Sequence, residues 1–288
     1  MDTAEILKKV RKIEIKTRGI SNQIFSGEYH SCFKGRGMSF SEVRAYEFGD
    51  DVRTIDWNVT ARLSQPYIKV FEEERELTVM LLIDVSASSF FGTQRVLKNE
   101  LMIEIAAVIA FSAINNNDKV GALFFSDKVI DYMPPKKGKS HILAFISRLI
   151  AQECTTDKTN ISNALQYITN MQKKRTICFM LSDFIDKDYL KSVQICARKH
   201  DLIGVRIQDI REHTLENIGL IRVQDSETRQ IKWLDTAHKK TQQHYTQQFM
   251  QFGKNFNNIF RKSGANTIEI NTMDDYTKVL LKFFKSRK

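Results

Sequence analysis

Residues 77–88 read Leu-Thr-Val-Met-Leu-Leu-Ile-Asp-Val-Ser-Ala-Ser, an apolar run that ends in a carboxylate and two hydroxyls. The run Leu77–Ile83 is almost wholly apolar, which is typical of a strand covered on both faces. In an open parallel sheet, ligands bind in the crevice beyond the carboxyl ends of the strands. The sequence therefore predicts a buried strand and, directly after it, a candidate binding loop at Asp84–Ser88.

Similar apolar runs alternate with helical patterns along the following hundred or so residues. We expect buried strands at residues 119–125, 176–181 and 202–206, a short edge strand at 129–133, and helices at 95–114, 141–151, 161–171 and 187–199. Strands that alternate with helices of this length predict an α/β fold, with an open, mostly parallel, doubly wound sheet and helices on both of its faces.

The two ends of the chain are less regular. Residues 218–223 and 230–234 predict a hairpin, followed by a polar helix at 238–261, a last strand at 267–270 and a closing helix at 274–284. At the start, helical spacing of Ile6, Val10 and Ile13, with Asp2 and Glu5 as a capping box, predicts a short amphipathic helix. Residues 26–51 are interpreted as an ordered loop region or irregular strands without a core of their own. We therefore expect an extension over residues 1–76 that packs on a main domain over 77–288.

Composition excludes several classes of protein. The net charge of +10 over 288 residues is divided evenly between residues 77–207 and 208–288 rather than gathered into a stripe, so specific nucleic-acid binding is not expected. The longest apolar run, Ile105–Phe111, is far shorter than a membrane span, and the polar start Met1–Glu5 shows no signal peptide, which predicts a cytoplasmic protein without membrane insertion. The four cysteines are spaced as reduced, mostly buried thiols rather than as zinc ligands or disulfides: Cys32, Cys154, Cys178 and Cys196.

Asp84, Ser86 and Ser88 alternate in the loop after the first strand, so their side chains can converge if the loop curls. One carboxylate and two hydroxyls form an all-oxygen ligand set that suits Mg²⁺ or Mn²⁺. The competing interpretation is a polar loop whose serines cap the following helix.

Two further residues lie at the same predicted edge of the sheet. Thr159 precedes the helix at 161–171, and Asp183 follows the strand at 176–181. Taken singly, Thr159 could be a helix N-cap and Asp183 a solvent-facing turn acid or a cap. Three oxygen-bearing loops on one rim favour a shared site over three independent caps.

This pattern resembles the metal-ion-dependent adhesion site of von Willebrand factor type A domains. Asp84, Ser86 and Ser88 match its D-x-S-x-S motif, Thr159 the threonine of its second loop and Asp183 the aspartate of its third, although Lys158 stands where a glycine often precedes the threonine. The resemblance implies that the three hydroxyls contact a divalent ion, Mg²⁺ or else Mn²⁺ or Ca²⁺, and that the two carboxylates act largely through water. It also implies that an acidic side chain of a protein partner completes the coordination.

The segment before the strand is similar to the signature of a bacterial family known as domain of unknown function fifty-eight. The match includes Lys34–Gly37, Arg44, Gly49–Asp51 and Ile55–Trp57, and extends over most of the chain. Members often accompany AAA+ ATPases of the MoxR type, so the resemblance implies a MoxR-type ATPase, or a membrane-anchored type A protein, as partner. The charges of this segment suggest an ion-pair network, which we interpret as a structural collar that packs with Tyr46 and Trp57 rather than as a second active site: Arg36, Glu42, Arg44, Asp50, Asp51, Arg53, Asp56 and Arg62.

Two functions from different classes remain. The first is a non-enzymatic, metal-dependent protein-interaction module that acts in a chaperone or assembly system with an ATPase. The second is a Mg²⁺-dependent hydrolase or phosphatase that uses Asp84 and Asp183. The first is favoured because no histidine lies in the three rim loops to act as a general base. In addition, Ser86 stands where dehalogenase-like phosphatases need a second aspartate.

Overall fold

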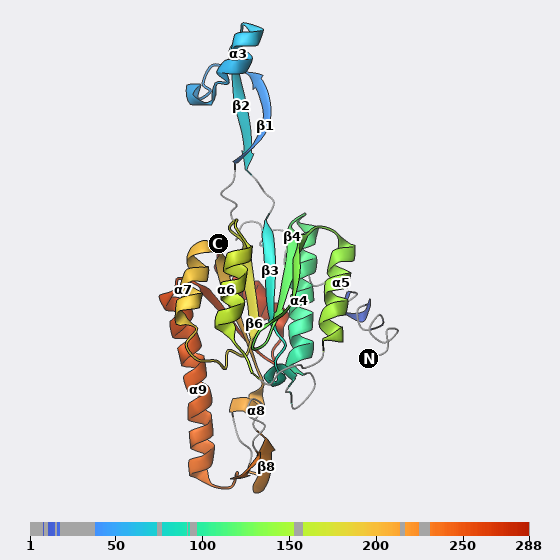
Figure 1. Ribbon diagram of the computed structural model, residues 1–288, viewed down its shortest axis with the longest axis vertical. Coiled ribbons are helices and arrows are strands. Elements are labelled where there is room, and N and C mark those ends of the chain that lie inside the picture. Colours follow the sequence, from blue (N-terminus) through green and yellow to red (C-terminus); the bar gives the residue numbers. More distant parts are fainter. Residues whose placement is uncertain are drawn as a thin grey trace. The chain divides into compact units, whose positions relative to one another are not determined.

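Figure 1 shows the computed structural model of the chain, which describes residues 8, 11–14, 16–17, 38–73, 77–90, 92, 97–152, 158–213, 217–224 and 231–287. They form two compact units. Residues 33–77 make up the smaller unit, and residues 1–32 together with 78–288 make up the larger one. The expectation that the extension packs on the main domain stays a prediction.

The larger unit is built on a six-stranded sheet in the order β10-β7-β6-β3-β4-β5. Five strands are parallel and β5 runs antiparallel to β4 at the edge. The strands are β3 (Thr78–Asp84), β4 (Lys119–Phe125), β5 (Val129–Lys136), β6 (Ile177–Ser182), β7 (Asp201–Gln208) and β10 (Asn266–Asn271). The predicted open, mostly parallel, doubly wound sheet is therefore confirmed.

Helices cover both faces of this sheet (Figure 1). On one face, the rings of Phe145 in α5 and Phe284 in α10 pack against Phe124 and Phe179 of the sheet, and α4 contacts α5. On the other face, α6 and α7 pack side by side and α9 packs on α7. The helices are α4 (Lys98–Asn115), α5 (Lys139–Ala151), α6 (Ile161–Met171), α7 (Leu190–Lys199), α9 (Lys239–Lys262) and α10 (Tyr276–Ser286).

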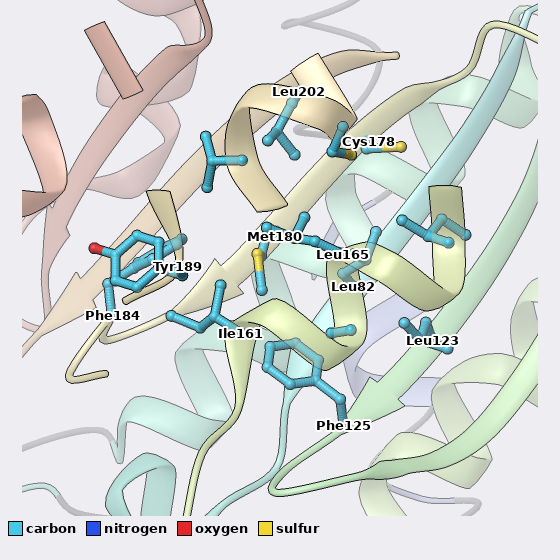
Figure 2. Close-up of a cluster of buried hydrophobic side chains, with 14 of the residues drawn as sticks. Leu82, Leu123, Phe125, Ile161, Leu165, Cys178, Met180, Phe184, Tyr189 and Leu202 are labelled. Atoms are coloured by element: carbon cyan, nitrogen blue, oxygen red, sulfur yellow. The ribbon is translucent and has the colours of Figure 1, made fainter. Parts of the chain in front are cut away.

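The core between the sheet and α6, α7 and α9 shows why the strands are so apolar. Met180, Leu82 and Leu123 come from three neighbouring strands and form one cluster with Ile161 and Leu165 of α6 (Figure 2). All five are fully buried. Because successive residues of a strand point to opposite faces, the intervening residues fill the core under α4, α5 and α10. Burial on both faces explains the unbroken apolar runs.

The order of the strands reverses between β3 and β6. The chain leaves β3 through α4 to reach β4 on one side, and it leaves β6 through α7 to reach β7 on the other side. In chain order the sheet is thus 3-2-1-4-5-6, with its switch point at the carboxyl ends of β3 and β6. This is where the type A-like fold implied by the sequence places its binding loops.

Most predicted elements begin and end within a few residues of the observed ones, and the differences have physical causes. The helix predicted from Lys187 begins only at Leu190, because Asp188 adopts a left-handed φ of 60° that a helix does not allow. The edge strand predicted to end at Met133 continues to Lys136 through Pro134 and Pro135. Proline is tolerated there because an edge strand leaves one side of its backbone unpaired.

The smaller unit is a hairpin with two helical segments. Strands β1 (Met38–Ala45) and β2 (Tyr67–Glu73) pair antiparallel, and between them lie a 3₁₀ helix (Val52–Thr54) and α3 (Trp57–Leu63). Residues 38–45 form a strand whose register shifts between Phe40 and Glu42, which agrees with the expectation of irregular strands, whereas residues 26–37 lie outside the described part. Of the side chains described in this unit, only Ile68 is buried.

The charged residues of this unit pair mostly with close neighbours. Arg44 binds Asp50 at 2.7 Å, Arg53 binds Asp51 at 3.3 Å, and Lys69 lies 3.4 Å from Asp56. Arg36 lies outside the described residues. Trp57, the first residue of α3, is 70% exposed, so the described part of this unit leaves it largely uncovered, and the expectation of a collar that packs with Tyr46 and Trp57 stays a prediction.

The remaining segments agree with the predictions where they are described. Lys8 and residues 11–14 and 16–17 are helical, and Lys16 binds Glu104 of α4, whereas Asp2, Glu5, Ile6 and Val10 lie outside the described residues. The predicted hairpin is β8 (Leu220–Gln224) with β9 (Ile231–Asp235), and it follows the short helix α8 (Ile210–His213). Cys178 and Cys196 are buried free thiols; Cys32 and Cys154 are not described. In the described part of the chain, no helix combines the length and apolar character needed to cross a membrane.

Candidate metal-binding site at the switch point

Asp84 is the last residue of β3 and Asp183 directly follows β6, the strand beside it. Both carboxylates therefore lie at the switch point of the sheet. The loop after β3 supplies Ser86 and Ser88, and the segment before α6 supplies Thr159. The hydrogen bonds described below show that all five predicted site residues come together.

The loop after β3 curls so that its hydroxyls converge. Oδ1 of Asp84 accepts a hydrogen bond from the backbone N–H of Ser86 at 3.0 Å, and the hydroxyls of Ser86 and Ser88 lie 3.2 Å apart. The hydroxyl of Ser89 donates to the carbonyl of Ser86 at 2.6 Å and closes the short 3₁₀ turn Ala87–Phe90. The serines do not cap the next helix, because the N-cap of α4 is Leu97, which makes no side-chain cap.

Thr159 faces the same cluster. Its hydroxyl donates to Oγ of Ser86 at 2.9 Å and lies 3.5 Å from Oδ2 of Asp84. The helix cap that Thr159 could have supplied is made instead by Asn160, whose side chain accepts from the N–H of Asn163. The hydroxyl of Thr159 is thus directed to the site and not to its own helix.

Asp183 is buried, with 3% of its surface exposed, which excludes a solvent-facing turn acid. Its Oδ1 accepts from the N–H of Ile185 at 3.2 Å, and its Oδ2 accepts from the ammonium of Lys98 at 3.0 Å. A hydrogen bond from Ser88 also reaches this carboxylate and links it to the first loop.

Four residues that the sequence analysis did not single out support the site. Ser182 donates to Oδ2 of Asp84 at 2.7 Å, and Arg206 of β7 donates to the carbonyl of Asp183 at 3.3 Å. Lys98 binds Asp183 and also Glu212 of α8. Ser182 could have been found as the neighbour of Asp183. Lys98 could also have been found from the sequence. A lysine at the start of an apolar helix lies at the positive end of the helix dipole, which predicts acidic partners nearby.

The two carboxylates differ in their electrostatics. Burial and the negative charge of Asp183 raise the pKa of Asp84 to about 6, against the hydrogen bonds from Ser182 and Ser86. Burial acts to raise the pKa of Asp183 as well, but the charge of Lys98, with hydrogen bonds from Ser88 and Lys98, outweighs it and lowers that pKa. Among the described residues, Asp183 has a cation beside it and Asp84 has none.

The oxygen atoms of the site fit a small divalent ion. Adjacent ligands about 2.1 Å from an octahedral Mg²⁺ are separated by about 3.0 Å, and the hydroxyl pairs Ser86–Ser88 and Thr159–Ser86 lie 3.2 and 2.9 Å apart. The donors are hydroxyls and carboxylates, which are hard ligands. Within the described ranges no three His, Cys, Asp or Glu side chains are grouped to hold a metal, so a site here depends on its hydroxyls. The role of the five residues as ligands stays a prediction.

The fold and the site define a doubly wound α/β protein with a hydroxyl-rich site at the switch point of its sheet. The family model "Protein of unknown function DUF58" matches residues 42–254, and the chain belongs to this family. It is 24% identical to the uncharacterized protein Rv1480 of Mycobacterium tuberculosis, over 100% of this chain and 92% of that protein. The family predicted from the sequence is thus confirmed.

Comparison with solved structures gives similar folds at low sequence identity. BatB from Bacteroides thetaiotaomicron matches with a TM-score of 0.45 and 11% identity, over 73% of this chain and 98% of BatB. The VWA domain of SpRpn10 matches with a TM-score of 0.38 and 9% identity, over 74% of this chain and 95% of that domain. Proximal thread matrix protein 1 of the mussel byssus, solved with a zinc-occupied MIDAS motif, has a TM-score of 0.36 and 16% identity, over 46% of this chain and 38% of that protein.

Proposed function

We propose that this protein is a non-enzymatic interaction module that uses a divalent metal ion to bind an acidic residue of a protein partner. The observation that carries the proposal is the convergence of three hydroxyls and two buried carboxylates at the switch point. Ser86, Ser88 and Thr159 would contact the ion directly, and Asp84 and Asp183 would act through water. The preferred ion is Mg²⁺, with Mn²⁺ and Ca²⁺ as alternatives of the same hard class.

The composition of the site supports ligand binding over catalysis. A divalent ion held mainly by neutral hydroxyls would keep net positive charge and an open coordination position that a partner's carboxylate can fill. The described residues of the three loops include no histidine, and Asp84 already accepts hydrogen bonds from Ser86 and Ser182. A hydrolase would need a free general base beside the metal. The partner we propose is an AAA+ ATPase of the MoxR type or a membrane-anchored type A protein, within a cytoplasmic chaperone or assembly system.

The experiment compares Asp84→Asn with Asp188→Asn, which makes the same chemical change at an exposed carboxylate of the third loop. Isothermal titration with MgCl₂ should give a measurable affinity for the wild type and Asp188→Asn, and none for Asp84→Asn. Equal affinity in all three proteins would remove the metal site.

A second measurement tests the class of function. Tagged wild-type protein should retain a MoxR-type ATPase, identified by mass spectrometry, in buffer with Mg²⁺, and should lose it with EDTA or with Asp84→Asn. Retention that is indifferent to EDTA would contradict a metal-dependent interface. Turnover of p-nitrophenyl phosphate that requires Mg²⁺ and disappears in Asp84→Asn would show instead that the protein is a phosphatase.

A further inference from the structure

Lys98 is a fully buried lysine beside the candidate metal site. It is the first residue of α4, a helix whose N-terminus has no side-chain cap. A buried ammonium loses its hydration, and at a helix N-terminus it also faces the positive end of the helix dipole. Such a position is stable only when nearby carboxylates hold the charge.

Two buried carboxylates bind this ammonium, Asp183 of the candidate site and Glu212 outside it. The ammonium of Lys98 lies 3.0 Å from Oδ2 of Asp183 and 2.6 Å from Oε1 of Glu212. Glu212 comes from α8, outside the three rim loops, and its second oxygen accepts from the N–H of Asp209 at 2.8 Å. Both acids are buried, at 3% and 8% exposure, so solvent screens these interactions weakly.

We propose that Lys98 is a built-in competitor of the divalent ion, which lowers the affinity of the site, and that Glu212 is the carboxylate to which its ammonium is drawn when a metal engages Asp183. This inference rests on the proposed function and adds the control of metal affinity to it. A cation and a divalent ion that share one carboxylate repel each other across a poorly screened interior. The shorter bond to Glu212 gives the ammonium a partner that it keeps when Asp183 turns to the metal.

A purely structural role for Lys98 predicts something different. If the lysine only anchored the start of α4, its replacement would change the thermal stability of the protein but leave the metal affinity of the folded molecules unchanged. Removing Lys98 alone would leave Glu212 buried and unpaired, which is strongly destabilising. The informative variant is therefore Lys98→Met with Glu212→Gln, which removes one positive and one negative charge together.

The experiment is isothermal titration of MnCl₂ into four proteins: the wild type, Glu212→Gln, Lys98→Met with Glu212→Gln, and Lys187→Met. The last is a matched control, because Lys187 is an exposed lysine in the loop that carries Asp183. We expect the double variant to bind Mn²⁺ at least about tenfold more tightly than the wild type, since the competing cation is gone. Glu212→Gln should bind Mn²⁺ several-fold more weakly. Of the two acids that bind Lys98, it leaves only Asp183 charged, so the ammonium is held more strongly at the metal site. Lys187→Met should stay within about twofold of the wild type, because an exposed charge is screened.

The outcomes separate this inference from the proposed function. Equal Mn²⁺ affinity in the wild type and the double variant would overturn the role of Lys98 and leave the metal site standing. Absence of binding in every protein would overturn both. Binding by the double variant alone would support the role of Lys98 and contradict a metal-dependent wild type. If circular dichroism shows the double variant unfolded, Glu212→Gln decides: weaker binding supports the competition and unchanged affinity refutes it.

Discussion

Asp84 ends β3 and Asp183 directly follows the neighbouring strand β6, yet the carboxylates of these two residues have opposite electrostatic surroundings. Asp84 accepts hydrogen bonds from neutral groups, the N–H of Ser86 and the hydroxyl of Ser182. Asp183 accepts from the ammonium of Lys98. Without a metal, the charge on Asp84 therefore opposes folding and the charge on Asp183 supports it.

The first prediction is that the two amide substitutions shift stability in opposite directions. In EDTA at pH 7, Asp84→Asn should raise the free energy of unfolding by about 1–2 kcal/mol, because it removes a buried carboxylate that has no cation beside it in the described part of the chain. Asp183→Asn should lower it, by less than the about 3–5 kcal/mol of an uncompensated buried charge, because Lys98 loses one carboxylate but keeps Glu212. Urea denaturation followed by circular dichroism measures both values. Destabilisation by Asp84→Asn of the same size as by Asp183→Asn would show that the two carboxylates are equivalent.

The second prediction concerns pH. The pKa of Asp84 rises from 3.8 to about 6 on folding, so the folded protein binds this proton more tightly than the unfolded chain does. Protonated Asp84 therefore makes its full contribution to stability below about pH 4, and this contribution is lost as the pH rises through about 6. The loss amounts to about 3 kcal/mol, at about 1.4 kcal/mol per pKa unit.

The measurement is the difference in unfolding free energy between wild type and Asp84→Asn across pH 4–8 in EDTA. Relative to Asp84→Asn, the wild type should become steadily less stable up to about pH 6, after which the difference should stay constant. Using the difference removes the contribution of other acids, such as Asp186, whose pKa burial also raises. A difference that does not change with pH would mean that folding does not raise the pKa of Asp84.

The sequence carried enough information for the sheet and for the five residues at its switch point. Leu77–Ile83 and the later apolar runs are long enough, and apolar enough, that only strands covered on both faces explain them. Once those strands are parallel, geometry alone places Asp84 and Asp183 at one edge. Thr159 followed because it precedes a helix that must start at the same edge.

Contacts between distant segments of the chain could not be predicted from the sequence. Lys98 and Glu212 are separated by 114 positions and meet because α8 packs near the start of α4, a relation that no local pattern encodes. The 70% exposure of Trp57 in the small unit could not be read from the sequence either, because tryptophan is highly buried on average.

The third prediction tests whether the second loop belongs to the site. Thr159→Ala removes the hydroxyl that donates to Ser86 at 2.9 Å, and should weaken Mg²⁺ binding about tenfold or more. Thr159→Ser keeps the hydroxyl and should stay within about threefold of the wild type. Because Asn160 caps α6, neither change should lower the melting temperature appreciably. If Thr159→Ala and Thr159→Ser both bind Mg²⁺ as tightly as the wild type, Thr159 is excluded as a ligand.

The fourth prediction concerns the core under α9. Gly204 lies in β7, and a Cβ atom there would approach the ring of Phe260 to 2.6 Å and that of Phe256 to 2.8 Å. Gly204→Ala should therefore destabilise the protein by about 1–3 kcal/mol, since an overpacked core must move its side chains. Both rings belong to α9 and are fully buried, so they have little room to yield.

Phe260→Leu provides the control for this prediction, because the smaller side chain vacates the space that the new methyl group needs. Combined with Gly204→Ala, it should cost at least about 1 kcal/mol less than the sum of the two single changes, as residues in contact are not additive. Chemical denaturation of the four proteins completes the cycle. Strict additivity would mean that the new methyl group does not meet the ring of Phe260, and it would contradict the close approach of α9 to β7 at Gly204.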